Sequence, residues 1–218
     1  MLSAWGYLGY QQKAAQSVGS LQAVVGSRET EREQLMSFES KLRDAQAQNV
    51  LVRIERSAFE ETCPDFLGYV LGVSDTLVCL ANVDDRVRFN GIDVFFHKQI
   101  SDLEVPSPHA TFYETALRLR GDTAPATPEI DLSSMKSALG SIAKLTPLVV
   151  IHREIEEPEA CEIGQIAGLE VKTFQLREID PDADWAESAS SYPYAEVTRV
   201  GFGGDYEGAL ALVAGAEI

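Results

Sequence analysis

Short apolar runs rich in β-branched residues recur along the chain, and they predict strands rather than long helices. Three of these runs precede residue 85 and three follow residue 145: 50–54, 68–73, 77–81, 148–151, 164–169 and 173–176. The runs at 68–73 and 164–169 each carry two glycines four residues apart. Such a pair on one strand predicts a sharp bend or a close approach of a neighbouring backbone.

These runs follow an internal repeat, and a repeat decides the architecture of a chain. Sliding the sequence by 96 residues aligns matching residue types of the two halves: Gly68 with Gly164, Gly72 with Gly168, Val73 with Leu169, Leu80 with Leu176, Val83 with Ile179 and Asp84 with Asp180. Near the end of each copy, YETALRL at 113–119 matches YEGALAL at 206–212. Chance similarity between two β-rich stretches is the alternative explanation.

The two copies differ after their third strand. In the first copy, Asn90-Gly91 is a strong signal for a type I′ hairpin turn, and two further strands are expected within 92–105. In the second copy, an acidic loop rich in Ser and Ala, 180–191, takes the place of that turn, and a strand is expected over 195–200.

Helical patterns close each copy and connect the two. In the first copy, Ser107 and Pro108 fit the N-cap and first position of a helix that ends at Gly121. The predicted helices span 30–47, 107–121, 131–145 and 205–213. Residues 121–128 (GDTAPATP) are a linker by composition. Residues 1–26 carry no clear pattern and are expected to be partly disordered.

These elements predict an α+β, mostly β fold. It is a tandem repeat of two small, strongly bent barrels, each closed by a short helix. The expected parts are a helical N-terminal segment over 1–48, a first barrel unit over 49–121, a linker with a helix over 122–145 and a second barrel unit over 146–218.

Two motifs of the first copy carry a resemblance. GYVLGVSDTLVCL at 68–80 combines glycine, apolar alternation and an acidic residue, and GIDVFFHKQISDL at 91–103 combines glycine, an apolar strand, a short basic turn and an isoleucine strand. Together they resemble the SH3-like five-stranded barrel of the Sm and Hfq-like families. The chain also resembles bacterial two-repeat proteins that end in a string such as FGGDYEGAL at 202–210.

The resemblance implies a fold without implying RNA binding. In Sm-type proteins, RNA binding is associated with an asparagine in the first motif and an Arg-Gly turn in the second. This chain has His97-Lys98 at that turn, and its second copy has no equivalent basic pair.

The net charge of −16 over 218 residues is concentrated near the C-terminus. Residues 146–218 hold fifteen acidic and four basic side chains, a net charge of −11. A field of this sign repels phosphate backbones and anionic lipid. No apolar window could span a bilayer, and three cysteines without a CxxC pair suit a reducing compartment. We therefore expect a cytoplasmic protein that binds neither membranes nor, on charge grounds, nucleic acid.

No pattern of catalytic, cofactor-binding or metal-ligating residues emerges. The histidines lie in no HxH or HExxH pattern: His97, His109 and His152. His152 and Cys161 could approach each other across a loop. The DxDxD opening at Asp180 lacks the glycine and the bidentate glutamate of a calcium loop, and GFGG at 201–204 fits no phosphate-binding spacing. We expect no enzyme activity, no cofactor and no metal.

The sequence therefore favours a non-enzymatic, acidic protein-binding module, such as an immunity-like or antitoxin-like inhibitor that covers a basic protein partner. Its candidate partner-binding residues are Asp180, Asp182, Asp184 and Trp185. One alternative is an Sm-like RNA-binding protein, with a candidate patch of Arg86, Arg88, His97 and Lys98. A second alternative is a structural subunit of an oligomeric assembly formed by edge-to-edge pairing. The oligomeric state itself is left open.

Overall fold

The computed structural model describes two ranges of the chain, residues 38–56 and 65–216. Residues from Glu39 onward form one compact unit, which contains all the strands of the described ranges. The described part begins with helical residues 38–48, which overlap the helix predicted over 30–47. The disorder expected over 1–26 lies outside the described residues.

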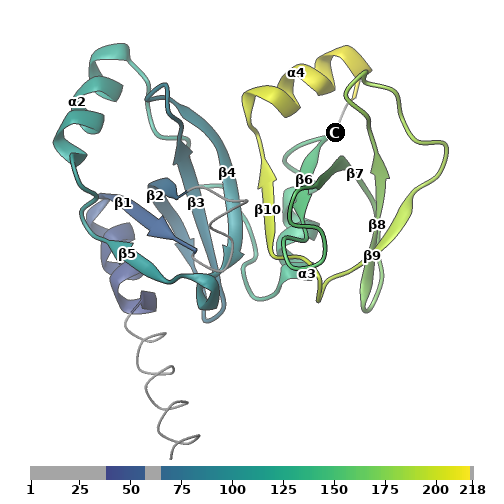
Figure 1. The fold of residues 1–218 in the computed structure, drawn as a ribbon, viewed down its shortest axis with the longest axis horizontal. Coiled ribbons are helices and arrows are strands. Elements are labelled where there is room, and N and C mark those ends of the chain that lie inside the picture. Colours follow the sequence, from purple (N-terminus) through teal and green to yellow (C-terminus); the bar gives the residue numbers. More distant parts are fainter. Residues whose placement is uncertain (1–37, 57–64, 217–218) are drawn as a thin grey trace, which may run out of the picture. The chain divides into compact units, whose positions relative to one another are not determined.

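The ten strands of the described residues form one open antiparallel sheet, in the order β5-β1-β2-β3-β4-β10-β6-β7-β8-β9 (Figure 1). The strands are β1 (Leu51–Glu55), β2 (Phe66–Val73), β3 (Leu77–Val83), β4 (Phe89–Phe96), β5 (Asp102–Glu104), β6 (Val149–His152), β7 (Cys161–Leu169), β8 (Thr173–Glu178), β9 (Ser190–Pro193) and β10 (Arg199–Phe202). The halves join because β4 pairs with β10, from Ile92 opposite Phe202 to Phe95 opposite Arg199.

The expectation of two small closed barrels is therefore wrong. Closure of a barrel in the first half would require its two outer strands, β4 and β5, to pair with each other. Instead, the outer edge of β4 is taken by β10, and β5 has only three residues and pairs with β1. The result is a continuous sheet with β5 at one end and β9 at the other.

The strands of the two halves nevertheless follow one another in the same spatial order. β5 pairs with β1 as β10 pairs with β6. The register shifts between Val70 and Gly72 where β2 meets β3, and between Ile166 and Gly168 where β7 meets β8. A Cβ on the first glycine of each run would collide with a carbonyl group across the pair, that of Ala81 for Gly68 and that of Arg177 for Gly164. Of the two alternatives predicted from the glycine spacing, a bend or a close backbone approach, the close approach is thus present.

One apolar core lies on one face of the sheet and crosses the join between the halves. It includes buried residues of α3 (Met135–Ile142) and of strands from both halves: Leu77, Val94, Val149, Ile151, Phe174, Leu176 and Val200. A Cβ on Gly72 would lie 2.9 Å from Leu132, and a Cβ on Gly140 would lie 3.0 Å from Leu169. The segment predicted as a linker is therefore packed against both halves.

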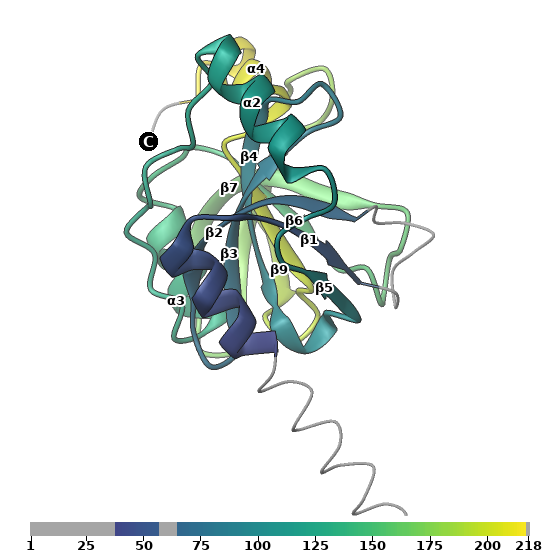
Figure 2. The ribbon, with the colours of Figure 1, turned by 90° about the vertical axis from the view of Figure 1, so that its left-hand side faces the viewer.

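The helices lie in two places. α3 and the helical residues 38–48 lie over one face of the sheet, whereas α2 (Ala110–Arg120) and α4 (Asp205–Ala214) lie at the same end of the strands (Figure 2). None of the helices in the described part of the chain is both long enough and apolar enough to cross a lipid bilayer.

α2 begins two residues later than the sequence predicts. Ser107 is buried ahead of the helix, where its backbone N–H donates to the carbonyl oxygen of Leu51 at 2.7 Å. His109 is the N-cap, in the left-handed conformation. The helix ends at Gly121, whose φ of 70° is that of the predicted C-terminal glycine.

Asn90 and Gly91 do not form the predicted hairpin turn, since both lie within β4. The chain turns earlier, over 84–88, where the carboxylate of Asp84 accepts hydrogen bonds from two backbone N–H groups of the turn. The side-chain oxygen of Asn90 instead accepts a hydrogen bond of 2.8 Å from the N–H of Asp205, the first residue of α4. Asn90 therefore ties the closing helix of the second half to the first half.

Candidate functional site

Charged side chains lie at the β4–β10 join on the sheet face opposite the core. Ile92 and Val94 of β4 belong to the core. Asp93 between them points to the other face, because neighbouring residues of a strand alternate. Arg199 of β10 is placed there for the same reason, since the next residue, Val200, is in the core.

Two arginines and two carboxylates form a buried network on this face. Arg199 donates from Nη1 to Asp93 Oδ1 at 3.1 Å and from Nε to Glu154 Oε1 at 3.4 Å. Arg56 donates to the same glutamate, from Nη2 to Oε2 at 2.6 Å. The side chains of Arg56 and Glu154 are 1% and 3% exposed. Burial opposes the ionisation of Glu154, but hydrogen bonds from Arg56 and Thr198 outweigh it and lower its pKa to about 2.

His152 of β6 and Cys161 of β7 are cross-strand neighbours, so the approach that the sequence suggested is present. Arg199 Nη2 lies 3.1 Å from His152 Nδ1, which must accept this hydrogen bond because arginine only donates. Burial and the charge of Arg199 lower the pKa of His152 to about 3, and burial raises the pKa of the Cys161 thiol. The imidazole is therefore neutral at pH 7, and the pair lacks the imidazolium that activates a thiolate.

The network borders a cavity of about 390 Å³, here called the junction cavity. Its lining comes from both halves and from the start of α4, and includes Asp93, His152, Arg199, Gly201, Tyr206 and Glu207. A Cβ on Gly201 would lie 3.1 Å from the Asp93 carboxylate, and a Cβ on Gly91 would lie 3.2 Å from the carbonyl oxygen of Phe202. Glycines thus keep open a space whose size is within the range of small-ligand pockets.

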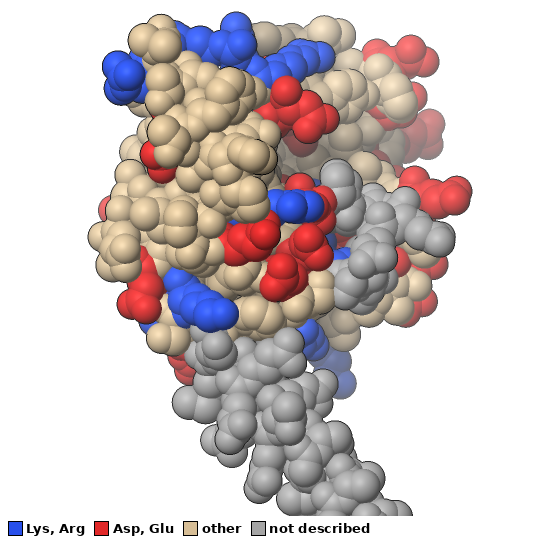
Figure 3. Space-filling model, turned by 60° about the vertical axis from the view of Figure 1, so that its left-hand side comes forward, with Lys and Arg blue, Asp and Glu red and all other residues tan. Residues whose placement is uncertain are grey.

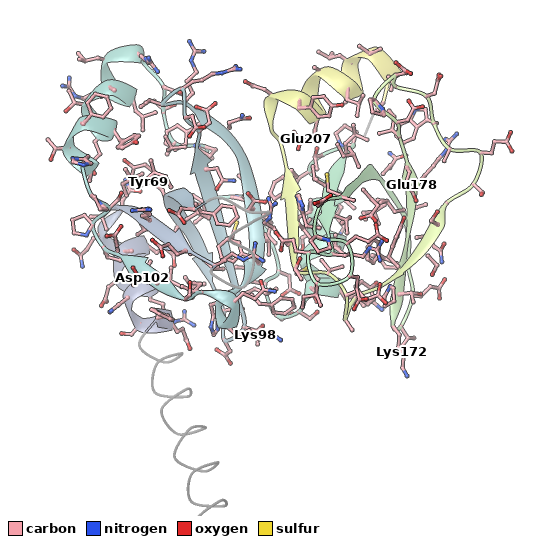
Figure 4. The ribbon with its side chains drawn as sticks, in the orientation of Figure 1. Tyr69, Lys98, Asp102, Lys172, Glu178 and Glu207 are labelled. Atoms are coloured by element: carbon pink, nitrogen blue, oxygen red, sulfur yellow. The ribbon has the colours of Figure 1, made fainter. Side chains whose placement is uncertain are left out.

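Glu207 is the carboxylate of the junction cavity that makes no ion pair with any described residue. It comes from the first turn of α4, where that helix meets β10 (Figure 4). Burial raises the pKa of Glu207, and the nearby carboxylates of Asp93 and Asp205 raise it further. The ion pairs of Arg199 are made with Asp93 and Glu154, not with Glu207.

The predicted partner-binding residues lie in the loop between β8 and β9. The carboxylate of Asp180 accepts hydrogen bonds from the backbone N–H groups of Asp182 at 3.0 Å and Asp184 at 2.9 Å, so it shapes the loop. All three aspartates are exposed. Trp185 is half-buried, pairs with Ile179 in an isolated bridge and packs in a small apolar cluster. It therefore supports the loop instead of projecting from it.

The structure does not bring the four residues of the predicted RNA-binding patch together. Arg86 and Arg88 lie in the turn before β4, whereas His97 and Lys98 follow its other end, about 23 Å away at roughly 3.3 Å per residue. His97 is buried and bonded to the backbone oxygen of Asp75. Figure 3 shows Lys and Arg gathered at the end of the molecule where α2 lies, close to the arginines of the turn.

The second half presents an acidic surface. Among residues 146–216, nine carboxylates are exposed: Glu156, Glu157, Glu159, Glu170, Asp180, Asp182, Asp184, Glu187 and Asp205. Of the four basic side chains in this range, Lys172 and Arg177 are exposed. Arg153 is 11% exposed and pairs with three carboxylates, and Arg199 is 15% exposed within the buried network.

Sequence reasoning missed the buried network and Glu207, although a signal was present. A charged residue inside an apolar strand is costly to bury unless it is paired. Asp93 within GIDVFF and Arg199 within RVGF are such residues, and either could have been taken as half of a buried pair. Their partners could not be found in this way, because they are more than one hundred positions apart.

The described residues were also compared with the two arrangements that the sequence raised, a metal site and an activated thiol. No three His, Cys, Asp or Glu side chains in the described ranges come close enough together to hold a metal ion. The thiol at the cavity faces a neutral imidazole, and its own pKa is raised. Cys63, the third cysteine, lies outside the described residues. Comparisons with protein families, with curated proteins and with solved structures find no match to this chain.

Proposed function

We propose that this chain is a non-enzymatic protein-binding module whose acidic second half covers a basic protein partner, as an immunity-like or antitoxin-like inhibitor does. The observation that carries the proposal is the imbalance of exposed charge over residues 146–216, nine carboxylates against two cations. We place this activity in the cytoplasm, where the free thiols of Cys79 and Cys161 stay reduced.

One basic residue of the second half is already paired with neighbouring carboxylates. Arg153 donates to Glu157 and Glu162 at 2.7 Å and to Glu196 at 3.1 Å, so its charge is neutralised by neighbouring carboxylates. The remaining carboxylates then act on a partner without local compensation. Complementary charge of this kind speeds association and selects against acidic partners, and salt weakens both effects.

The proposal is tested with a defined probe, a fluorescently labelled peptide of alternating Arg and Ser, and a second peptide with Glu in place of Arg. Fluorescence anisotropy at about 50 mM salt, where screening is weak, should show binding of the first peptide only. The double variant Glu156→Gln/Glu159→Gln, in the β6–β7 loop, and the double variant Asp182→Asn/Asp184→Asn should each weaken binding about fivefold.

The matched control is a double variant of exposed carboxylates in the first half, Asp85→Asn/Glu114→Gln. It removes the same charge from the chain, and we expect it to change the affinity less than about twofold. Equal losses in all three double variants would mean that net charge alone attracts the peptide. Absence of binding at low salt would end the proposal.

A second candidate, a structural subunit that extends its sheet from copy to copy, is favoured by the β4–β10 join. β9 corresponds to β4, since each is the fourth strand of its half, and β5 corresponds to β10, since each is the fifth. Pairing β9 of one copy with β5 of the next would repeat the internal join. In the internal join, Val94 of β4 lies opposite Val200 of β10. With the same register between copies, Ser191 of one copy would lie opposite Leu103 of the next.

This second candidate ranks below the first because β5 has the features of a protected edge. It has three residues, of which Asp102 and Glu104 are acidic, and short charged edges resist pairing. Sedimentation velocity over about a hundredfold range of concentration decides the matter, since assembly follows mass action. Assembly that Ser191→Pro abolishes and Ser191→Thr preserves would support edge pairing. A monomer throughout would exclude it.

A further inference from the structure

We propose that the junction cavity is a binding site for a guanidinium group, carried by an arginine side chain of the basic partner. The inference rests on the proposed function and deepens it, because it assigns one side chain of the partner to a specific cavity beside the acidic surface. Neither the acidic loop nor the turn arginines contribute to this site. It is built from the β4–β10 join and the first turn of α4.

The lining of the cavity combines apolar and charged residues, as a ligand with an apolar stem and a polar end requires. Apolar side chains from β6 and β7 form part of its wall, those of Val150 and Ile163. Arginine buries its methylene stem along such surfaces while its head group stays polar. Gly201 leaves room beside the carboxylate of Asp93, where the chain has no side chain of its own. An arginine stem could therefore lie against apolar side chains with its head group near the carboxylates of the cavity.

The charges of the cavity favour a cation over an anion or a neutral ligand. Asp93 is balanced by Arg199 at 3.1 Å, whereas Glu207 has no cationic partner among the described residues. Among the charged side chains that line the cavity, two carboxylates therefore face one guanidinium. An anion would be repelled, and a neutral ligand would leave the glutamate uncompensated.

A guanidinium fits this surplus better than an ammonium. Its planar fork presents five N–H donors and forms bidentate hydrogen bonds with a carboxylate, which a single ammonium cannot match. It also stacks on aromatic rings. Tyr206 precedes Glu207 in α4, lines the same cavity and is 55% exposed, so its ring is available to a ligand.

The test uses two small probes on the full chain, N-acetyl-arginine methylamide and N-acetyl-citrulline methylamide. The two have nearly the same shape, but citrulline carries no charge. Titration followed by NMR should shift the backbone amides of Gly201, Gly204 and Glu207. We expect arginine to bind about tenfold more tightly than citrulline, the gain typical of a hydrogen bond to a charged group. Equal affinities, or shifts confined to the acidic loop, would overturn the proposal.

Glu207→Gln removes the unpaired charge and keeps the shape of the side chain. It should reduce the affinity for the arginine probe about tenfold and leave the citrulline affinity unchanged. Glu187→Gln, at an exposed position of the acidic loop, is the matched control and should change neither. An unchanged arginine affinity in Glu207→Gln would contradict the assignment, and a folded spectrum of the variant rules out loss of structure as the cause.

The peptide assay of the proposed function separates the two ideas. If Glu207→Gln leaves binding of the Arg-Ser peptide unchanged while the loop variants weaken it, the acidic surface stands and the cavity is not the anchor. If the arginine probe binds in the cavity but the peptide does not bind to the chain, the cavity assignment stands and the acidic-surface proposal fails.

Discussion

Replacing Glu154 with glutamine removes the acceptor that two buried arginines share. Glu154 accepts hydrogen bonds from Arg56 at 2.6 Å and from Arg199 at 3.4 Å, and its side chain is 3% exposed. Glutamine has the same shape but no charge. Arg199 keeps Asp93 as its partner, whereas Arg56 loses its carboxylate in a place that water hardly reaches.

The pKa of Glu154 sets the size of the effect. It is about 2 in the fold, against 4.5 for the free side chain. Each tenfold change in an ionisation equilibrium is worth about 1.4 kcal/mol, so the ionised form stabilises the fold by about 3 kcal/mol at pH 7. Removing one partner of a buried ion pair costs about 3–5 kcal/mol in other proteins. We therefore expect Glu154→Gln to lower the free energy of unfolding by about 3 kcal/mol.

The pH dependence carries the stronger test. Because the pKa of the folded state is the lower one, the stabilisation is complete above the unfolded value and is lost as the pH falls from about 5 towards 2. Glutamine does not titrate. The difference between the wild-type chain and Glu154→Gln, measured by urea unfolding, should therefore shrink by about 2 kcal/mol between pH 7 and pH 3.

The exposed pair of Arg43 and Glu39 is the control. Its atoms lie 2.9 Å apart, but the arginine side chain is 47% exposed, so Glu39→Gln should cost less than about 1 kcal/mol. A cost for Glu154→Gln that matches this control would refute the reasoning. The same holds for a cost that is as large at pH 3 as at pH 7.

Two further predictions concern a glycine and the cysteines. Gly68→Ala should lower the free energy of unfolding by about 3 kcal/mol, because its Cβ would collide with the carbonyl of Ala81. Gly208→Ala lies in open space on α4 and should raise the free energy of unfolding by up to about 1 kcal/mol. Equal effects of the two variants in urea unfolding would contradict the close approach at Gly68. Iodoacetamide at pH 8 should modify exposed Cys161 about a hundredfold faster than Cys79, whose burial raises its pKa to about 12. Similar rates in peptide mapping would show that β3 is not buried as described.

Local patterns predicted the parts of this fold whose causes are local. Gly68 and Gly164 predicted a close backbone approach, because only a residue without a Cβ fits beneath a carbonyl group. Gly121 predicted the end of α2, because glycine readily adopts the left-handed conformation that it has there. The apolar runs predicted most of the strands, since β-branched residues suit a pleated, half-buried surface.

The joining of the halves could not be found in this way. Whether β4 pairs with β5 or with β10 depends on contacts between residues about one hundred positions apart, which no local pattern encodes. The Asn90-Gly91 signal failed for a similar reason. Asp84 offers the turn hydrogen bonds of its own, and Asn90 is used to hold the N-terminus of α4. The network around Glu154 was missed because its members come from four separate segments.

Because α3 packs against strands on both sides of the join, we expect that neither half folds when it is expressed alone. Each fragment would expose the apolar rows that the other covers, and it would aggregate. Cutting the gene at the exposed residues 123–124 gives fragments that should become soluble only when co-expressed, by docking through β4 and β10. Replacing α3 with a flexible spacer should therefore unfold both halves, because its buried residues pack against strands on both sides of the join.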